Sequence, residues 1–282
     1  MVRHIIPNNL KEALIYLTEG PFHIMAGGTD LMIQKRSSAG TPPKFAKDVL
    51  YIANLEELNY IKKDEEHNCL RIGAATKLED ICHHDDVPAL LKDVIREIGS
   101  PGIRHSGTLG GNIANASPAG DSLVALYLFD AEVVLLSVDG ERTMLLKNFI
   151  TGVRRIDLHA NELIKEIIIP NVLMTNYKWY KVGGRRADSI SKVSFAGLYL
   201  VNFGLVADIR FAFGSVSATV ARSLELENSL KNRPIEQVIA ELPRILEETN
   251  KLISPIDDQR SNKIYRRKVA NNIMERFIKS MK

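Results

Sequence analysis

The first 170 residues alternate short apolar runs that suit strands with segments in which apolar residues recur at helical spacing. Asn9 is expected to cap a first helix, Thr76 is expected to cap a short helix through Ile81, and Pro88 is expected to open a longer helix. Asp139-Gly140 predicts a hairpin turn. The expected strands are residues 22–26, 49–52, 70–74, 131–138, 143–146 and 162–169.

After Pro170 the pattern changes to alternating strands followed by helices. Strands are expected at 179–182, 193–201 and 205–213, and helices at 221–230, 235–246 and 257–281, the last capped by Asp257 or Asp258. Strands and helices interleave in the first part and follow one another in the second. The pattern therefore predicts an α+β fold rather than a doubly wound parallel sheet, with a domain boundary near residues 170–178.

Residues 106–121 stand apart, because they are rich in Gly, Asn, Ser and Ala and follow neither a helical nor a strand period. Such a stretch between two well-patterned segments predicts a loop with a function, although a flexible linker has the same composition. The helical pattern resumes at Leu123 and continues to Phe129.

Two Gly-Gly segments carry the sharpest candidate chemistry. One is Ala26-Gly27-Gly28-Thr29-Asp30, directly after an expected strand, and the other is Thr108-Leu109-Gly110-Gly111-Asn112. Consecutive glycines allow positive φ and turn successive N–H groups to one side, which forms a concave site that suits phosphate. Two such loops suit a diphosphate. Neutral hydrogen-bonding side chains would come from Thr29, Thr108, Asn112 and Ser117.

A plainer interpretation of these segments is that each Gly-Gly makes a tight turn. The chain has neither the G-x-G-x-x-G fingerprint of a Rossmann site nor the G-x-x-x-x-G-K-[ST] of a P-loop. Phosphate binding therefore rests on the two loops acting together.

The two loops belong to a longer series of motifs that resembles the FAD-binding subunit of molybdenum hydroxylases. This family includes the medium subunits of xanthine dehydrogenase and carbon monoxide dehydrogenase. The matching segments follow in order over nearly the whole chain: residues 26–31, 70–74, 108–112, 117–121, 162–170, 181–186, 254–258 and 265–267. Several ordered motifs at the right separations are a more specific signal than any one of them.

The resemblance implies a two-lobed FAD-binding domain of the vanillyl-alcohol-oxidase type, followed by an α+β C-terminal domain with an antiparallel sheet and helices. The implied domains are residues 1–174, with lobes of approximately 1–55 and 56–174, and residues 175–282. The implied cofactor is FAD. The residues implied to contact it are Ile24, Met25, Ala26, Gly27, Gly28, Thr29, Asp30, Leu31, Ile98, Thr108, Leu109, Gly110, Gly111, Asn112, Ser117, Asp121, Ile164 and Lys181.

Each group of these residues has an implied role. Residues 24–31 and 108–112 would wrap the FAD pyrophosphate, and Asp121 would hold its ribityl or ribose part. Ile98 and Ile164 would make apolar contacts, and Lys181 would make a polar contact from the C-terminal domain.

The resemblance also implies an electron-transfer subunit. Substrate would be oxidised at a molybdenum cofactor on a large subunit. Electrons would then pass through [2Fe–2S] clusters on a small subunit to this FAD, and on to NAD or another acceptor. Two alternatives stay open: a free-standing flavoprotein of the same fold that oxidises NAD(P)H directly, and a non-catalytic subunit that has kept the fold.

The composition fits one flavin site and no further redox centre. The chain has 282 residues, 45% hydrophobic and 25% charged, which is typical of a globular protein. Its two cysteines, Cys69 and Cys82, are too few to ligate an iron–sulfur cluster. No nucleophile with a base and no metal-binding motif is evident, so we expect no catalytic side chain and no metal site.

The net charge of +3 is too mild to indicate nucleic-acid binding. Residues 178–192 form a basic stretch, which suits either a solvated strand edge or charge compensation for a nucleotide. We find no apolar run of the ~20 residues that a membrane span needs, and no secretion signal. A cytoplasmic protein with reduced thiols is therefore expected.

Overall fold

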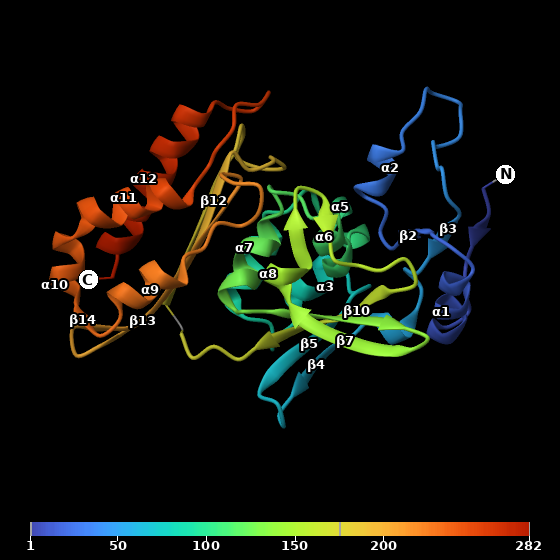
Figure 1. The fold of residues 1–282 in the computed structure, drawn as a ribbon, viewed down its shortest axis with the longest axis horizontal. Coiled ribbons are helices and arrows are strands. Elements are labelled where there is room, and N and C mark those ends of the chain that lie inside the picture. The colour runs from blue at the N-terminus through green and yellow to red at the C-terminus, as the bar shows by residue number, and fades with distance from the viewer. Residues whose placement is uncertain (1, 175, 282) are drawn as a thin grey trace.

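The computed structural model of the chain describes residues 2–174 and 176–281. A small N-terminal lobe lies at one end, a second lobe lies in the middle and the C-terminal part lies at the other end (Figure 1). The chain begins with a small lobe that holds a parallel sheet of order β1-β3-β2. Its elements are β1 (His4–Ile5), α1 (Leu10–Thr18), β2 (His23–Met25), α2 (Leu31–Gln34) and β3 (Val49–Tyr51). As expected, Asn9 caps α1, because its side chain accepts a hydrogen bond of 2.9 Å from the backbone N–H of Glu12.

The second lobe holds a five-stranded antiparallel sheet of order β4-β5-β10-β6-β7. The strands are β4 (Ile61–Asp64), β5 (Cys69–Gly73), β6 (Glu132–Ser137), β7 (Gly140–Leu145) and β10 (Leu163–Pro170). Around them lie η1 (Glu56–Leu58), α3 (Leu78–His83), α4 (Ala89–Arg96), α5 (Pro101–Ser106), α6 (Leu109–Asn115), α7 (Asp121–Leu128) and α8 (Leu146–Phe149). A short hairpin follows, formed by β8 (Ile150–Gly152) and β9 (Arg155–Ile156).

The C-terminal part has an antiparallel sheet of order β11-β12-β13-β14, as the alternating pattern predicted. The strands are β11 (Asn176–Val182), β12 (Val193–Asn202), β13 (Leu205–Gly214) and β14 (Arg233–Pro234). The helices are α9 (Leu224–Leu230), α10 (Ile235–Ala240), α11 (Leu242–Leu252) and α12 (Lys263–Lys279). One face of this sheet packs on α12, where Phe195, Phe211 and Phe277 are fully buried.

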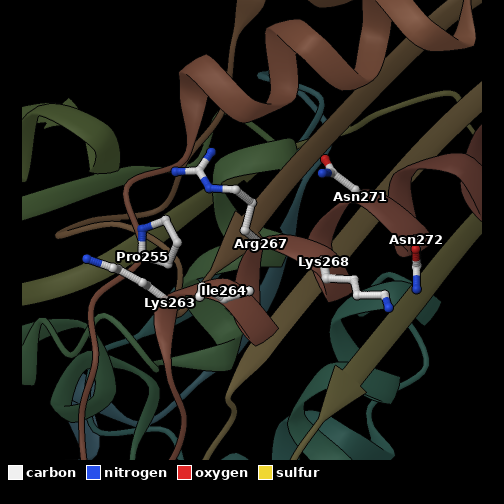
Figure 2. Close-up of a pocket in the computed structure, with 7 residues that line it drawn as sticks. All are labelled: Pro255, Lys263, Ile264, Arg267, Lys268, Asn271 and Asn272. Atoms are coloured by element: carbon white, nitrogen blue, oxygen red, sulfur yellow. The ribbon is translucent and has the colours of Figure 1, made fainter.

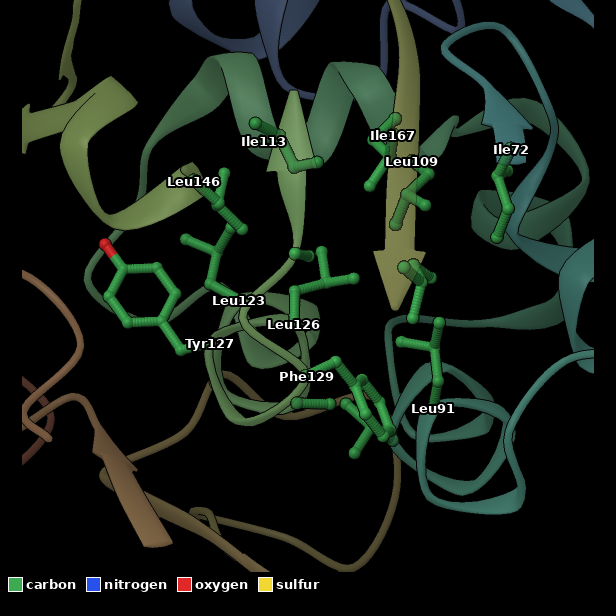
Figure 3. Packing of buried hydrophobic residues seen from close by; sticks show 14 of the residues in the cluster. Ile72, Leu91, Leu109, Ile113, Leu123, Leu126, Tyr127, Phe129, Leu146 and Ile167 are labelled. Atoms are coloured by element: carbon green, nitrogen blue, oxygen red, sulfur yellow. The ribbon is translucent and has the colours of Figure 1, made fainter. Parts of the chain in front are cut away.

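The other face of the C-terminal sheet packs on α7, and this contact joins the two parts of the chain. Every residue of α7 is buried, including its first residue, Asp121. Figure 3 shows Leu123, Leu126 and Tyr127 of α7 in the central cluster, with Ile167 of β10 nearby. A helix that is buried all round needs packed elements on both sides, so α7 fixes how the two parts meet.

The predicted loop at residues 106–121 is wrong over much of its length, because residues 109–115 form α6. The Thr108 side chain caps this helix by accepting a hydrogen bond of 3.1 Å from the N–H of Gly111. Gly110 faces Ala74 so closely that a Cβ at this position would lie 2.7 Å from the Cβ of Ala74. The helix buries Leu109 and Ile113 at helical spacing together with Gly110, but two apolar residues among Gly, Asn and Ala did not stand out as a period in the sequence.

Three expected helix limits also move. Thr76 does not cap α3, since its hydroxyl bonds to the backbone of Tyr60 instead. The single helix expected at residues 235–246 is two helices, because Pro243 opens α11 after α10 has ended. The last helix begins at residue 263 under an Asn262 cap, not at Asp257 or Asp258.

Among the helices within residues 2–174 and 176–281, none is long and apolar enough to cross a membrane.

Candidate functional site

A cleft runs between the small lobe, α6 and the C-terminal sheet, and it consists of two adjoining cavities. The first, of about 270 Å³, lies between residues 24–34 and α6. The second, of about 870 Å³, extends from α7 to the C-terminal sheet and the segment before α12. Thr29, Asp30, Ile98 and Asn112 line both cavities, so the two form one elongated site.

The cleft brings together most of the residues proposed from the sequence. The first cavity is lined by Ile24, Met25, Ala26, Gly27, Gly28, Thr29, Asp30, Leu31, Ile98, Thr108, Gly111 and Asn112. The second adds Ser117, Asp121 and Lys181. Leu109, Gly110 and Ile164 line neither cavity, because Leu109 and Ile164 point into the central core and Gly110 packs on Ala74.

The first glycine segment presents a row of backbone N–H groups to the cleft. Within the described residues, no N–H from Gly27 to Leu31 donates a hydrogen bond to a protein acceptor. Gly28 has φ +68°, which turns the chain between β2 and α2. A Cβ at Gly27 would overlap the carbonyl oxygen of Ser106, whose hydroxyl donates to the Gly27 carbonyl at 3.1 Å. The loop is thus held against α5 with its amides left for a ligand.

The second glycine segment does not form the second phosphate-binding loop that the sequence predicted. Neither Gly110 nor Gly111 has positive φ, because both are helical. The Gly110 N–H donates to the Ala74 carbonyl at 3.0 Å, and the Gly111 N–H is taken by Thr108. The segment therefore offers no such row of amides, and the prediction of two anion-binding loops is corrected to one. Gly111 instead keeps the cavity wall free of a side chain.

Asp121 and Lys181 form a buried ion pair across the two parts of the chain. The Lys181 Nζ lies 2.7 Å from Asp121 Oδ2, and both side chains are more than nine-tenths buried. Asp121 also accepts from the hydroxyl of Ser191 at 2.6 Å, and Lys181 donates to the Glu97 carbonyl at 2.6 Å. Burial raises the pKa of Asp121, and the Lys181 charge works against that rise.

Lys181 belongs to a face of β11 that is tied to α4 and the turn after it. The Tyr177 hydroxyl donates to Asp93 at 2.6 Å, and the Trp179 indole donates to the Glu97 carboxylate at 3.1 Å. Trp179, the single tryptophan of the sequence, also packs on the central core. These bonds fix the second cavity between α7 and β11.

Several lining residues were not proposed from the sequence. In the first cavity these are Gln34, Leu78, Ile103, Gly107, Ala114, Asn115 and Arg154. In the second they include Ser189, Ile190 and Ser191, and residues of the C-terminal sheet and the segment before α12. Asn115 could have been proposed from the sequence, since it lies next to the glycine motif at residues 108–112. Arg154 could not, because it lies in a hairpin turn far along the chain and belongs to no motif.

The arrangement suits an elongated ligand with a diphosphate. The free amides match phosphate oxygens, and the missing Cβ of Gly111 leaves room beside them. The larger cavity offers apolar Ile98, Ile103 and Ile190 beside polar groups, as a flat heteroaromatic ring requires. No cluster of His, Cys, Asp or Glu able to hold a metal ion occurs in the part of the chain that the structure describes.

A separate groove of about 660 Å³ lies along α12 and shares no lining residue with this cleft (Figure 2). Lys263, Arg267 and Lys268 line it together with Ile264. The Arg267 side chain is held against the last turns of α11, since it donates to the Asn250 carbonyl at 2.7 Å. None of the proposed site residues contributes to this groove.

Comparison with known proteins gives matches over nearly the whole chain. Residues 1–172 match the family described as the FAD binding domain in molybdopterin dehydrogenase, and residues 178–281 match the CO dehydrogenase flavoprotein C-terminal domain. The glyceraldehyde dehydrogenase medium chain of Sulfolobus acidocaldarius is 30% identical over 99% of this chain and 97% of its own length. The nicotinate dehydrogenase FAD-subunit of Eubacterium barkeri is 36% identical over 66% of this chain and 64% of its own.

A solved structure also resembles this fold closely. It is the carbon monoxide dehydrogenase of Hydrogenophaga pseudoflava that lacks the Mo-pyranopterin moiety of its cofactor. The TM-score is 0.86 at 25% identity, and the match covers 98% of this chain and 95% of the other.

Proposed function

Since this chain belongs to the family of FAD-binding subunits of molybdenum hydroxylases, we propose that it receives electrons from [2Fe–2S] clusters on a partner and passes them to an external acceptor. The observation that carries the proposal is the row of unpaired amides from Gly27 to Leu31 in a long cleft. Bound FAD supplies the redox chemistry, because a flavin exchanges electrons singly or in pairs.

The chain's own residues bind and orient this cofactor. We propose that the amides of residues 27–31 hold the diphosphate, with Thr108, Gly111 and Asn112 on the facing wall. The flavin end then occupies the larger cavity, beside Ser117, Asp121 and Lys181. The fixed ion pair and the packed α7 keep this cavity in one shape, which limits the reorganisation that electron transfer requires.

The proposed domains are residues 1–174, with lobes of about 1–55 and 56–174, and residues 175–282. Separate sheets support this division, and so does the cluster between the C-terminal sheet and its helices, which contains residues of that part alone. The two lobes and the C-terminal sheet all contribute to the cleft, so the cofactor would bridge every unit.

Partner chains would carry the other redox centres. We propose a large molybdenum-cofactor subunit, where substrate is oxidised, and a small [2Fe–2S] subunit, with NAD or another molecule as acceptor. Cys69 and Cys82 are buried and unpaired, and burial raises the pKa of the Cys82 thiol to about 11, so neither is a ready metal ligand. Two free thiols also fit our proposal of a reducing, cytoplasmic location.

Purification of the native complex tests the proposal. We expect this chain to copurify with a molybdenum subunit and a [2Fe–2S] subunit, and its FAD to be reduced when the complex is given substrate. Flavin that stays oxidised while the clusters are reduced would refute the electron path. A chain that purifies alone and is rapidly bleached by NAD(P)H would favour a free-standing oxidoreductase instead.

A further inference from the structure

Arg154 is a cation at the junction of the two cavities. It lines both cavities, and its guanidinium makes neither an ion pair nor a hydrogen bond within the described residues. It is also the one cation among the lining residues of the first cavity, where Asp30 is the one acid. The wall opposite the amide row therefore carries one positive charge, and the described residues form no ion pair with it.

The backbone of Arg154 is held in an unfavourable conformation. Its φ of +54° lies in the left-handed region, which glycine and asparagine adopt far more easily than arginine. The residue sits in the turn between β8 and β9, and its N–H donates to the carbonyl of Ala116 at 3.0 Å. Ala116 ends α6 and is itself left-handed, with φ +43°. The turn is thus pinned to the end of the helix that forms the cleft wall.

A turn alone gives no reason for arginine at this position, since Gly or Asn would remove the strain. Arginine is instead suited to phosphate, because its planar guanidinium can donate two parallel hydrogen bonds to a phosphate group. The amides of Gly27 to Leu31 supply only partial positive charge, and a diphosphate brings a full negative charge on each phosphate. We propose that Arg154 pairs with the diphosphate of FAD from the wall opposite the amide row.

This proposal rests on the FAD site but not on the direction of electron flow. It predicts a contribution specific to the diphosphate, so it is separable from contacts to the flavin ring. It also predicts that FAD affinity depends on where the arginine lies and not on the net charge of the chain. The neighbouring Arg155 offers the matched control, because it is exposed like Arg154 and lies in the same hairpin but lines neither cavity.

The test uses the full chain stripped of flavin and measures the Kd for FAD and for riboflavin by fluorescence quenching. We expect Arg154→Gln to weaken FAD binding on the order of 10- to 100-fold, as the loss of a charge-assisted phosphate contact requires. Riboflavin binding should not change, and Arg154→Lys should restore part of the FAD affinity. Arg155→Gln should leave both constants within about twofold of the wild type, because Arg155 lines neither cavity and its charge is screened by solvent.

A second variant separates binding from folding. Arg154→Gly removes the cation and the backbone strain together, so its unfolding midpoint without flavin should be no lower than the wild-type value. Its FAD affinity should fall as far as that of Arg154→Gln. Unchanged FAD affinity in the glycine variant, or equal losses in Arg154→Gln and Arg155→Gln, would overturn the proposal. So would an equal loss of riboflavin binding. Failure of electron transfer in the native complex would leave these constants unaffected.

Discussion

Removing the lysine of the buried ion pair should destabilise the chain and make its stability strongly dependent on pH. Lys181→Met keeps most of the side-chain volume but leaves Asp121 without its charge partner at 5% exposure. Breaking a buried pair by removing one partner costs about 3–5 kcal/mol, because the remaining charge stays desolvated. The Ser191 hydroxyl still donates to Asp121, so we expect a value near the lower end, about 3 kcal/mol.

The sign of the pH dependence follows from the pKa of Asp121. Burial already raises this pKa above its ordinary value of 3.8, and loss of the Lys181 charge raises it further. A carboxyl whose pKa is higher in the folded state binds its proton more tightly there, so stability falls as the pH rises from about 4 through the folded-state pKa. The deficit of Lys181→Met should be small near pH 4 and complete once Asp121 has ionised.

Urea unfolding of the flavin-free chain between pH 4 and pH 8 measures this deficit. Lys178→Met is the matched control, because Lys178 lies on the opposite face of β11 and makes no ion pair among the described residues. Asp121→Asn combined with Lys181→Met removes both charges and should recover much of the lost stability. A deficit in Lys181→Met that is below 1 kcal/mol, or that is equally large at pH 4 and pH 8, would refute the reasoning.

Further substitutions test other parts of the structure. Gly111→Val should abolish FAD binding in a folded protein, whereas Gly110→Val should prevent folding because its Cβ would overlap Ala74 after β5. Circular dichroism reports whether each variant folds, and flavin absorbance reports whether it binds FAD. Full flavin content in Gly111→Val would contradict the proposed role of Gly111 in the cavity wall. Phe203 is fully exposed with φ +50° in a two-residue turn, so Phe203→Asn should raise the free energy of unfolding by about 1 kcal/mol, and no gain in urea would contradict this. Arg222→Ala leaves Glu227 buried at 1% exposure without its charge partner and should lower the free energy of unfolding by about 3 kcal/mol. An unchanged midpoint in thermal unfolding would contradict this expectation.

The hydrophobic pattern was sufficient to predict the α+β class and the long strands, because these depend on local periodicity. The alternating strands of the C-terminal sheet and the hairpin at Asp139 lie where the pattern placed them. The Asn9 cap was also predictable, since its hydrogen bond joins residues three apart. Features decided by neighbours close in sequence were thus accessible.

Features decided by distant contacts were not. The glycines of α6 suggested a loop, but Gly110 is required by the close approach of Ala74, which directly follows β5. Thr76 was expected to serve its own helix, yet its hydroxyl is used by Tyr60. Arg154 carries no motif of its own and comes to the cleft only because β8 and β9 fold back on the end of α6. The ion pair of Asp121 with Lys181 likewise joins residues that no local pattern connects.

The small size of the first lobe bears on how long the cofactor stays bound. The amide row belongs to a lobe whose core is one small cluster, formed largely by α1, β3 and the turn after it. Units with few buried contacts open locally at a lower free energy than that of global unfolding. We therefore expect FAD to leave by transient opening of this lobe while α7 and both large sheets stay folded. Amide hydrogen exchange in β2 and β3 should then slow on FAD binding far more than exchange in β12. The rate at which the chain loses FAD would be set by the opening of these few strands.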